Sequence, residues 1–269
     1  MAEVKTIAVI GAGIMGRGIA HTAALGGYRT ILEDILPASL RKAESEIRSN
    51  LDKAVELGKV KKDDADAAFR RLEYAGSVEE AARAADLVIE AVPEEIESKI
   101  EIFTLLDKIC RPATLIASNT SSLSITEIAS VTYRASKCLG MHFFNPVHKM
   151  KLLEIVRALE TDDETLAAAV EVGRRMGKEV VVVKESPGFI TSRINVLIGF
   201  MPTRMTSGSP LVIPPSSPPA RFVRRLTLPL RGEPGSGSIS SCTSLPRRRD
   251  PSNPKPISTA FTAGMDIIA

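Results

Sequence analysis

The sequence predicts an α/β protein built on a doubly wound, mostly parallel sheet, followed by a C-terminal segment of a different kind. Short apolar stretches alternate with amphipathic stretches from residue 5 to residue 183, the pattern of parallel strands joined by helices. A glycine-rich turn joins the first strand to the first helix. Beyond residue 200 the alternation stops, and proline, serine and arginine become frequent.

The first strand–helix–strand unit shows this pattern most clearly. Residues 5–10 are an apolar strand, and residues 14–25 carry alanine and glycine on the packing side of a helix. Gly26 and Gly27 end this helix, since glycine favours helix C-termini. A second strand follows at residues 29–33.

The alternation then continues through the rest of the first part. Two charged amphipathic segments, 37–57 and 63–70, predict a paired helical arm. Further helices are predicted at residues 78–85, 95–110 and 163–176. Further strands are predicted at residues 72–75, 87–92, 114–118, 138–144, 152–156 and 179–183.

The charge and the prolines are distributed unevenly between the two parts. Residues 1–200 carry a net charge of −3 and residues 201–269 a net charge of +6, so the basic character belongs to the tail and gives no reason to expect nucleic-acid binding. Twelve of the 17 prolines and eleven serines lie within residues 201–260. Such a segment cannot bury enough apolar surface to offset its chain entropy, so we expect it to be disordered.

Several classes of protein are excluded by simple features. No apolar run reaches the roughly 18 to 20 residues that a membrane span needs. The N-terminus enters a strand-like run at once and lacks the features of a signal peptide. Cys110, Cys138 and Cys242 lie far apart without metal-ligand spacing, so we expect no disulfide framework, no metal site and a cytoplasmic location.

The glycine-rich turn predicts a Rossmann-like unit that binds a dinucleotide. Gly11 permits the tight turn, Gly13 lets the backbone approach a pyrophosphate, and Gly16 allows close packing of helix on sheet. The helix N-terminus supplies free N–H groups and the positive end of its dipole. The expected cofactor-binding residues of this turn are Gly11, Ala12, Gly13, Ile14, Met15 and Gly16.

An acidic residue at the end of the second strand indicates which dinucleotide binds. Asp34 lies 18 positions after Gly16, and its carboxylate can accept hydrogen bonds from both ribose hydroxyls while repelling a 2′-phosphate. This favours NAD over NADP. Glu33 is the alternative acid, but alternation along the strand points it away from the site.

Three histidines are available as a general base. His21 lies within the first helix, where a packing role is the simpler interpretation, and His148 lies beside lysines in an expected surface loop. His142 stands near the end of the strand at residues 138–144, and open α/β sheets bind ligands at the carboxyl ends of their strands. Spacing alone leaves a catalytic and a structural role for His142 equally open.

Several motifs resemble those of the 3-hydroxyacyl-CoA dehydrogenases. They are the glycine turn, DLVIEAVPE at residues 86–94, SNTSSLSITEIA at 118–129, GMHFFNPVHKMKLLEIV at 140–156 and KESPGFITSRI at 184–194. The similarity runs from residue 4 to about residue 199, and within the family it is greatest to the short bacterial 3-hydroxybutyryl-CoA dehydrogenases.

The resemblance implies a reaction and the residues that carry it. It implies NAD-dependent oxidation of a (S)-3-hydroxyacyl-CoA, such as 3-hydroxybutyryl-CoA, to the 3-oxoacyl-CoA, or the reverse reduction, in fatty acid or butanoate metabolism. The catalytic histidine of the family falls on His142, its partner acid on Glu154, and the serine that hydrogen-bonds the substrate oxygen on Ser121. Without the family, Glu154 could face solvent from a strand and Ser121 could cap a helix.

The resemblance also implies contacts with the cofactor and with coenzyme A. Asn145, Glu94 and Lys99 match positions that contact the cofactor, and Ser121 lies near it as well. By themselves, Asn145 before a proline is common turn chemistry, and Glu94 and Lys99 could belong to a solvated helix start. Lys53 and Lys59, on the charged arm, are candidates for binding the coenzyme A phosphates.

Two features depart from the family pattern. Ser192 stands where many members carry a catalytic-site asparagine, and its hydroxyl can still form a hydrogen bond there. After residues 187–199, which match the start of a C-terminal domain helix, the family continues with an all-helical domain that forms its homodimer, but residues 200–269 do not resemble that domain.

The tail therefore leaves two interpretations of the chain. We expect residues 1–186 to form the NAD-binding domain with the catalytic His and Glu, and residues 200–269 to be disordered or an out-of-frame translation. The first interpretation is a dehydrogenase that binds an acyl-CoA, and the alternative is a catalytically impaired NAD-binding remnant of the family. Under the second, NAD binding survives better than turnover, because half of the substrate cleft is missing.

Overall fold

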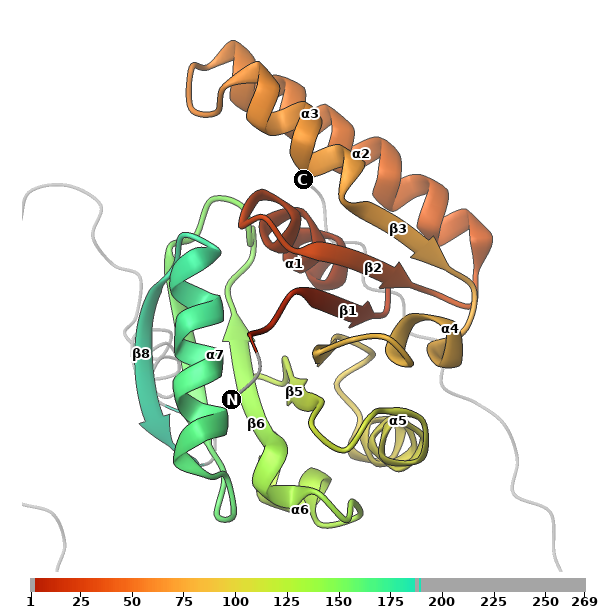
Figure 1. Ribbon diagram of the computed structural model, residues 1–269, viewed down its shortest axis with the longest axis vertical. Coiled ribbons are helices and arrows are strands. Elements are labelled where there is room, and N and C mark those ends of the chain that lie inside the picture. Colours follow the sequence, from red (N-terminus) through yellow and green to blue (C-terminus); the bar gives the residue numbers. More distant parts are fainter. Residues whose placement is uncertain (1–2, 187–188, 190–269) are drawn as a thin grey trace, which may run out of the picture. The chain divides into compact units, whose positions relative to one another are not determined.

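The computed structural model describes residues 3–186 and residue 189, and an eight-stranded sheet forms its centre (Figure 1). The strand order is β3-β2-β1-β4-β5-β6-β7-β8. β1 to β6 are parallel, β7 is antiparallel to β6, and β8 is parallel to β7. The predicted doubly wound, mostly parallel sheet is therefore confirmed.

The elements follow the predicted order closely. The strands are β1 (Thr6–Ile10), β2 (Arg29–Glu33), β3 (Leu72–Ala75), β4 (Leu87–Glu90), β5 (Leu115–Ser118), β6 (Cys138–Phe143), β7 (Leu152–Arg157) and β8 (Glu179–Lys184). The helices are α1 (Ile14–Leu25), α2 (Pro37–Glu56), α3 (Lys62–Arg70), α4 (Val78–Ala82), α5 (Ile96–Ile109), α6 (Ile125–Ala129) and α7 (Asp163–Arg175), with the 3-10 turn η1 (Ala135–Lys137).

The sheet has a separate apolar core on each face. One core joins the sheet to α1, α2, α3 and α7 through residues such as Ile19, Ile47 and Val172. The other joins it to α4, α5 and α6 through residues such as Phe103 and Ile128. β1 is buried at every position, because helices cover both sides of a parallel strand.

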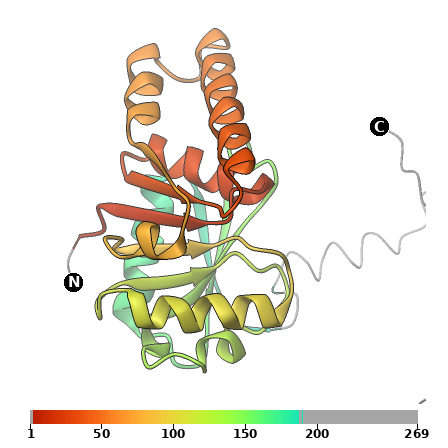
Figure 2. The same ribbon diagram turned by 90° about the vertical axis from the view of Figure 1, so that its right-hand side faces the viewer.

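The charged segments predicted as an arm form the antiparallel pair α2–α3, which projects beyond the sheet (Figure 2). Ala43, Ile47 and Leu51 of α2 repeat every four residues and are buried, while the other faces of α2 stay polar. Ala65 and Ala68 of α3 are buried as well. One apolar stripe on each helix thus suffices to hold the arm together.

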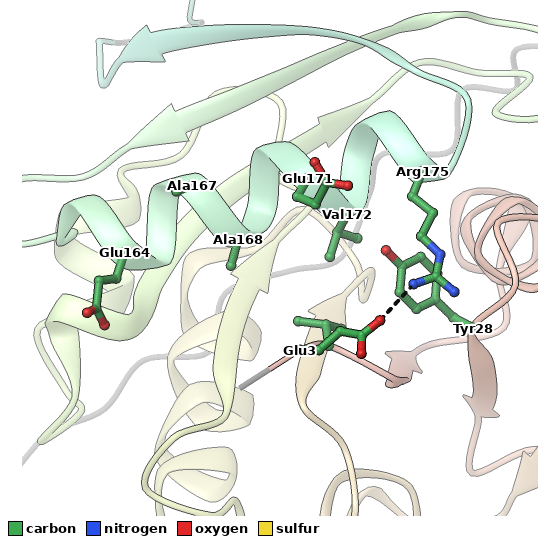
Figure 3. Close-up of a pocket in the computed structure, with 9 residues that line it drawn as sticks. Glu3, Tyr28, Glu164, Ala167, Ala168, Glu171, Val172 and Arg175 are labelled. Atoms are coloured by element: carbon green, nitrogen blue, oxygen red, sulfur yellow. Dashed lines mark hydrogen bonds and ion pairs between the residues drawn. The ribbon is translucent and has the colours of Figure 1, made fainter. Parts of the chain in front are cut away.

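Helix α7 is tied to the start of β2 by one arginine. The guanidinium of Arg175 lies 4.7 Å from the centre of the Tyr28 ring, and its Nε donates to the carbonyl of Gly26 at 3.0 Å. It also lies 3.4 Å from a carboxylate oxygen of Glu3 (Figure 3). This contact fixes α7 against the amino-terminal ends of the strands, opposite to the ligand-binding edge expected for this fold.

The differences from the predicted elements are small. The short helix α6 was not predicted. Helix α4 ends at Ala82 rather than residue 85, and β4 ends at Glu90 rather than residue 92. None of the helices in the described part of the chain is both long and apolar enough to cross a membrane.

His21 gives the fold a predicted pH dependence. It is 3% exposed, its ring stacks on His148 with centroids 5.5 Å apart, and burial, helped by His148 and Lys178, lowers its pKa to about 4. His21 and His148 line a small pocket together with Arg17 and Glu46, which form an ion pair with each other. The unfolded chain takes up a proton on this histidine near its ordinary pKa, whereas the folded protein does so only near 4. Stability therefore falls as the pH drops between these values.

We expect the His21→Gln variant to lose this part of the pH dependence. Between about pH 7 and pH 4.5 the wild-type protein should lose about 2 to 3 kcal/mol more unfolding free energy than the variant. Urea titrations of both proteins at the two pH values measure the difference, in which the other titrating groups cancel. Equal losses in the two proteins would show that His21 is not the source.

Candidate active site

The carboxyl ends of β1, β4, β5 and β6 meet at one edge of the sheet, and the order of the strands reverses between β1 and β4. Open α/β sheets bind ligands at such a point. A cavity of about 390 Å³ lies at this edge. The predicted site residues that line it are Met15, Glu94, Lys99, Ser121, His142 and Asn145.

The glycine turn between β1 and α1 has the shape that a pyrophosphate requires. Gly11 has a φ of 96°, and a Cβ on Gly16 would lie 1.7 Å from the carbonyl oxygen of Gly11, so neither position accepts a side chain. A Cβ on Gly13 would meet nothing within 4 Å, which leaves open space above the turn. No side chain caps the start of α1. The turn and the helix N-terminus therefore fit an anionic group.

Asp34 lies beside this turn, as expected. One carboxylate oxygen accepts a hydrogen bond from the N–H of Ala12 at 3.0 Å, and the other accepts from the N–H of Leu36 at 2.9 Å. These contacts fix the carboxylate next to the glycine turn. The neighbouring Glu33 is 2% exposed, and burial, with Asp34 nearby, raises its pKa to about 7. Asp34 is thus the acid that reaches the cofactor side of β2.

His142 and Glu154 form a buried pair across two antiparallel strands. They lie directly opposite each other on β6 and β7, and Nδ1 of His142 is 2.8 Å from Oε2 of Glu154. Because a carboxylate only accepts, this contact selects the tautomer with the proton on Nδ1 and leaves the lone pair on Nε2. His142 is 7% exposed and Glu154 1%, so the interpretation of Glu154 as a solvent-facing residue is wrong.

Two aromatic rings surround the imidazole of His142. The ring of Phe144 lies 4.4 Å away and that of Phe189 5.7 Å away, measured between centroids. Phe189 is 1% exposed. The apolar surroundings limit the access of water to His142, which strengthens its contact with Glu154.

Glu94 organises the loop that carries Ser121. Its Oε1 accepts hydrogen bonds from Thr120 Oγ1 at 2.6 Å, from the Ser121 N–H at 2.7 Å and from Ser121 Oγ at 3.0 Å. Burial acts to raise the pKa of Glu94, but these hydrogen bonds and the nearby Lys99 ammonium outweigh it and hold the pKa below its usual value. Glu94 is therefore an anion at neutral pH.

Lys99 is buried, so the interpretation as a solvated helix residue is wrong. Its side chain is 1% exposed, and Nζ lies 2.7 Å from Oε1 of Glu90 and 3.3 Å from Oε2 of Glu94. Two carboxylates thus hold one ammonium at the wall of the cavity. Ser121 does not cap a helix either, because Ser124 is the residue whose side chain accepts from the first turn of α6.

The two candidates for binding the coenzyme A phosphates do not line this cavity. Lys53, in the last turn of α2, and Lys59, which follows that helix, are exposed and line no part of the cavity. The candidate Ser192 lies outside the described residues, as do the predicted helix start and the predicted tail.

Some residues of the site were missed by sequence reasoning. Asn119 lines the cavity, and its Oδ1 accepts a hydrogen bond from the N–H of Phe143, which joins β5 to β6. Thr120 is fully buried and holds Glu94. The sequence feature that could have indicated both is the run of polar residues 119–122, which follows the end of β5. The run by itself does not show which of these side chains reach the cavity.

A second groove, of about 410 Å³, lies along α7 next to Tyr28 and Arg175 (Figure 3). Val4 and Ala168 also line it, at the amino-terminal ends of β1 and β2. This is the wrong edge of the sheet for a cofactor. Within residues 3–186 and 189, no group of three or more His, Cys, Asp or Glu side chains is placed to hold a metal ion.

The comparisons with known proteins agree on one family. Residues 6–186 match the family described as "3-hydroxyacyl-CoA dehydrogenase, NAD binding domain". The probable 3-hydroxybutyryl-CoA dehydrogenase of Bacillus subtilis is 43% identical over 192 residues, which cover 71% of this chain and 67% of the relative. The 3-hydroxybutyryl-CoA dehydrogenase of Bradyrhizobium diazoefficiens is 40% identical over 193 residues, covering 72% and 66%.

The solved structures give the same result. The crystal structure of (S)-3-hydroxybutyryl-CoA dehydrogenase from Ralstonia eutropha superposes with a TM-score of 0.70 at 39% identity, and the match covers 73% of this chain and 69% of that one. The chain spans about two thirds of the length of the Bacillus subtilis and Bradyrhizobium diazoefficiens relatives. Among the two interpretations of the sequence, these relatives favour the dehydrogenase over the impaired remnant.

The predicted cofactor is confirmed as well, because the matched domain is an NAD-binding domain. The glycine turn and Asp34 lie within the matched residues. From the fold, the cavity and these matches, the chain belongs to the 3-hydroxyacyl-CoA dehydrogenase family.

Proposed function

We propose that this chain catalyses the NAD-dependent oxidation of (S)-3-hydroxybutyryl-CoA to acetoacetyl-CoA, and the reverse reduction. The observation that carries the proposal is the buried His142–Glu154 pair, whose histidine lines a cavity at the same edge of the sheet as the dinucleotide turn. The names of the relatives support the short acyl chain. We also propose that the domain with this chemistry is contained within residues 1–186.

Each side chain of the site has a separate role in the oxidation. The lone pair on Nε2 of His142 takes the proton of the 3-hydroxyl group, and the Glu154 carboxylate stabilises the imidazolium that forms. Ser121 hydrogen-bonds the substrate oxygen and so aligns the hydroxyl with His142, from a loop that Glu94 holds in place. Phe144 and Phe189 keep the pair in an apolar environment.

A second set of residues fits the cofactor. The turn from Gly11 to Gly16 would hold the pyrophosphate, Asp34 the adenosine ribose, and Lys99 and Asn145 the nicotinamide end. Bound NAD would supply the acceptor for the hydride that leaves C3 of the substrate. Lys53 and Lys59 remain candidates for the coenzyme A phosphates, because their exposed ammonium groups extend from the arm.

Formation of NADH from NAD tests this proposal. The wild-type chain should reduce NAD with (S)-3-hydroxybutyryl-CoA, and much more slowly with the (R) enantiomer or with free 3-hydroxybutyrate. The enantiomer places its hydroxyl away from His142, and the free acid lacks the binding energy of coenzyme A. Equal rates with both enantiomers would contradict the proposed arrangement of His142 and Ser121.

Asp34 should set the preference for NAD. In Asp34→Asn the charge that repels a 2′-phosphate is lost and the hydrogen bonds to the ribose weaken, so the affinity for NADH should fall roughly tenfold. The ratio of kcat/KM with NADH to kcat/KM with NADPH should fall by more than about tenfold, because the repulsion of the 2′-phosphate is lost as well. Kinetics with both cofactors measure this ratio. Glu33→Gln is the matched control and should keep the wild-type ratio, and a similar change in both variants would contradict the assignment to Asp34.

The cytoplasmic location expected from the cysteine usage belongs to the same proposal. The homodimer of the family is not part of it, because residues 200–269 do not resemble the domain that forms that dimer.

A further inference from the structure

A second buried carboxylate lies directly behind the cavity. Glu90, the last residue of β4, is fully buried and does not line the cavity. Its Oε1 accepts hydrogen bonds from Lys99 Nζ at 2.7 Å and from the Val92 N–H at 2.8 Å, and its Oε2 accepts from Ser118 Oγ at 2.6 Å. All three donors belong to the segments that form the cavity wall.

The contact with Lys99 is the strongest of the three by its chemistry. Lys99 is 1% exposed, and removing an ammonium from water is favourable only when carboxylates and hydrogen bonds replace the water. Glu90 is fully buried with it, whereas the other carboxylate, Glu94, is 41% exposed and also serves Thr120 and Ser121. Glu90 is therefore the main counter-charge of Lys99.

The position of Glu90 also links two strand ends. Its carbonyl accepts from the N–H of Asn119, and its side chain holds Ser118, whose Oγ accepts from the N–H of Thr120. The loop that carries Ser121 thus starts from a residue that Glu90 fixes. One carboxylate orients the ammonium and the start of the serine loop at the same time.

We propose that Glu90 is a positioning residue, which acts through Lys99 to fix the nicotinamide end of the cofactor site. Glu90 touches neither substrate nor cofactor, and its effect on the reaction passes through the Lys99 ammonium. This inference rests on the proposed function, which assigns Lys99 to the nicotinamide end of the cofactor. It can nevertheless be tested by measuring cofactor binding alone.

The test is a double-mutant cycle on the full chain with Glu90→Gln, Lys99→Met and both together. NADH affinity is followed by the enhancement of NADH fluorescence, which suits a chain without tryptophan. Each single variant should weaken NADH binding roughly 10- to 100-fold, because each leaves a buried group without its main charged partner. In the Lys99→Met background, Glu90→Gln should change the affinity by less than about twofold.

The controls separate positioning from general stability. Glu73→Gln breaks the exposed ion pair with Arg29 and should leave NADH affinity unchanged. The double variant should recover thermal stability relative to Glu90→Gln, because no unpaired charge stays buried, while NADH affinity stays low. If Glu90→Gln does not fold, Glu90→Asp replaces it in the cycle, since its carboxylate is withdrawn by one methylene group.

Two results would overturn the inference. One is a double variant whose loss of NADH affinity equals the product of the two single losses, because Glu90 and Lys99 would then act independently. The other is a folded Glu90→Gln protein with wild-type NADH affinity. If the wild-type chain failed to reduce acetoacetyl-CoA, the proposed function would be wrong, but the cycle in NADH affinity would still decide the role of Glu90.

Discussion

Replacement of His142 by alanine is expected to lower kcat for acetoacetyl-CoA reduction by about 10²- to 10⁴-fold, the usual contribution of a general acid–base residue. The imidazole is the group in the cavity wall whose position and tautomer are fixed by a buried carboxylate. NADH affinity should change little, because we propose that the glycine turn and Asp34 hold the dinucleotide. Steady-state kinetics and an NADH titration measure the two effects separately.

His148→Gln is the matched control for this variant. His148 lies six residues further along the chain and stacks on His21, outside the cavity lined by His142. It should retain nearly the wild-type kcat. If His142→Ala kept more than about a tenth of the wild-type rate, proton transfer by His142 could not be the basis of turnover.

Replacement of Glu154 by glutamine should have the second largest effect. An amide can present either its oxygen or its NH₂ group to Nδ1, so the tautomer of His142 is no longer fixed and the imidazolium loses its counter-charge. We expect kcat to fall by on the order of 10²- to 10⁴-fold, as in other catalytic pairs of histidine and carboxylate. KM for acetoacetyl-CoA and the affinity for NADH should change little.

A double variant sharpens this prediction. His142→Ala combined with Glu154→Gln should be no slower than His142→Ala alone, because Glu154 acts through the histidine. Glu171→Gln, on the exposed side of α7, serves as the control for loss of a single carboxylate. A further large loss of kcat in the double variant would show that Glu154 has a role of its own in the reaction.

The sheet and the cofactor turn could be predicted because their signals are local. The apolar residues of β1, the glycines that follow it and Asp34 lie within one continuous stretch, and each has a single physical reason for its type. The structure places them as expected.

The proposed catalytic pair could not be predicted from local signals. His142 and Glu154 lie 12 residues apart and meet only because β7 runs antiparallel to β6 with these two residues in register. Spacing alone left His142 undecided, and the family resemblance was needed to choose it. The burial of Lys99 could not be predicted either. Nothing in the sequence indicates that a lysine near the start of a helix is buried against Glu90.

The most direct test of the account is the rate at which the wild-type chain oxidises NADH with acetoacetyl-CoA, measured together with NADH binding. The account predicts saturable turnover with both compounds, at a rate that the His142→Ala variant loses while it still binds NADH. Tight NADH binding without any turnover in the wild-type chain would contradict it, because the His142–Glu154 pair would then be present without the reaction it is proposed to carry out.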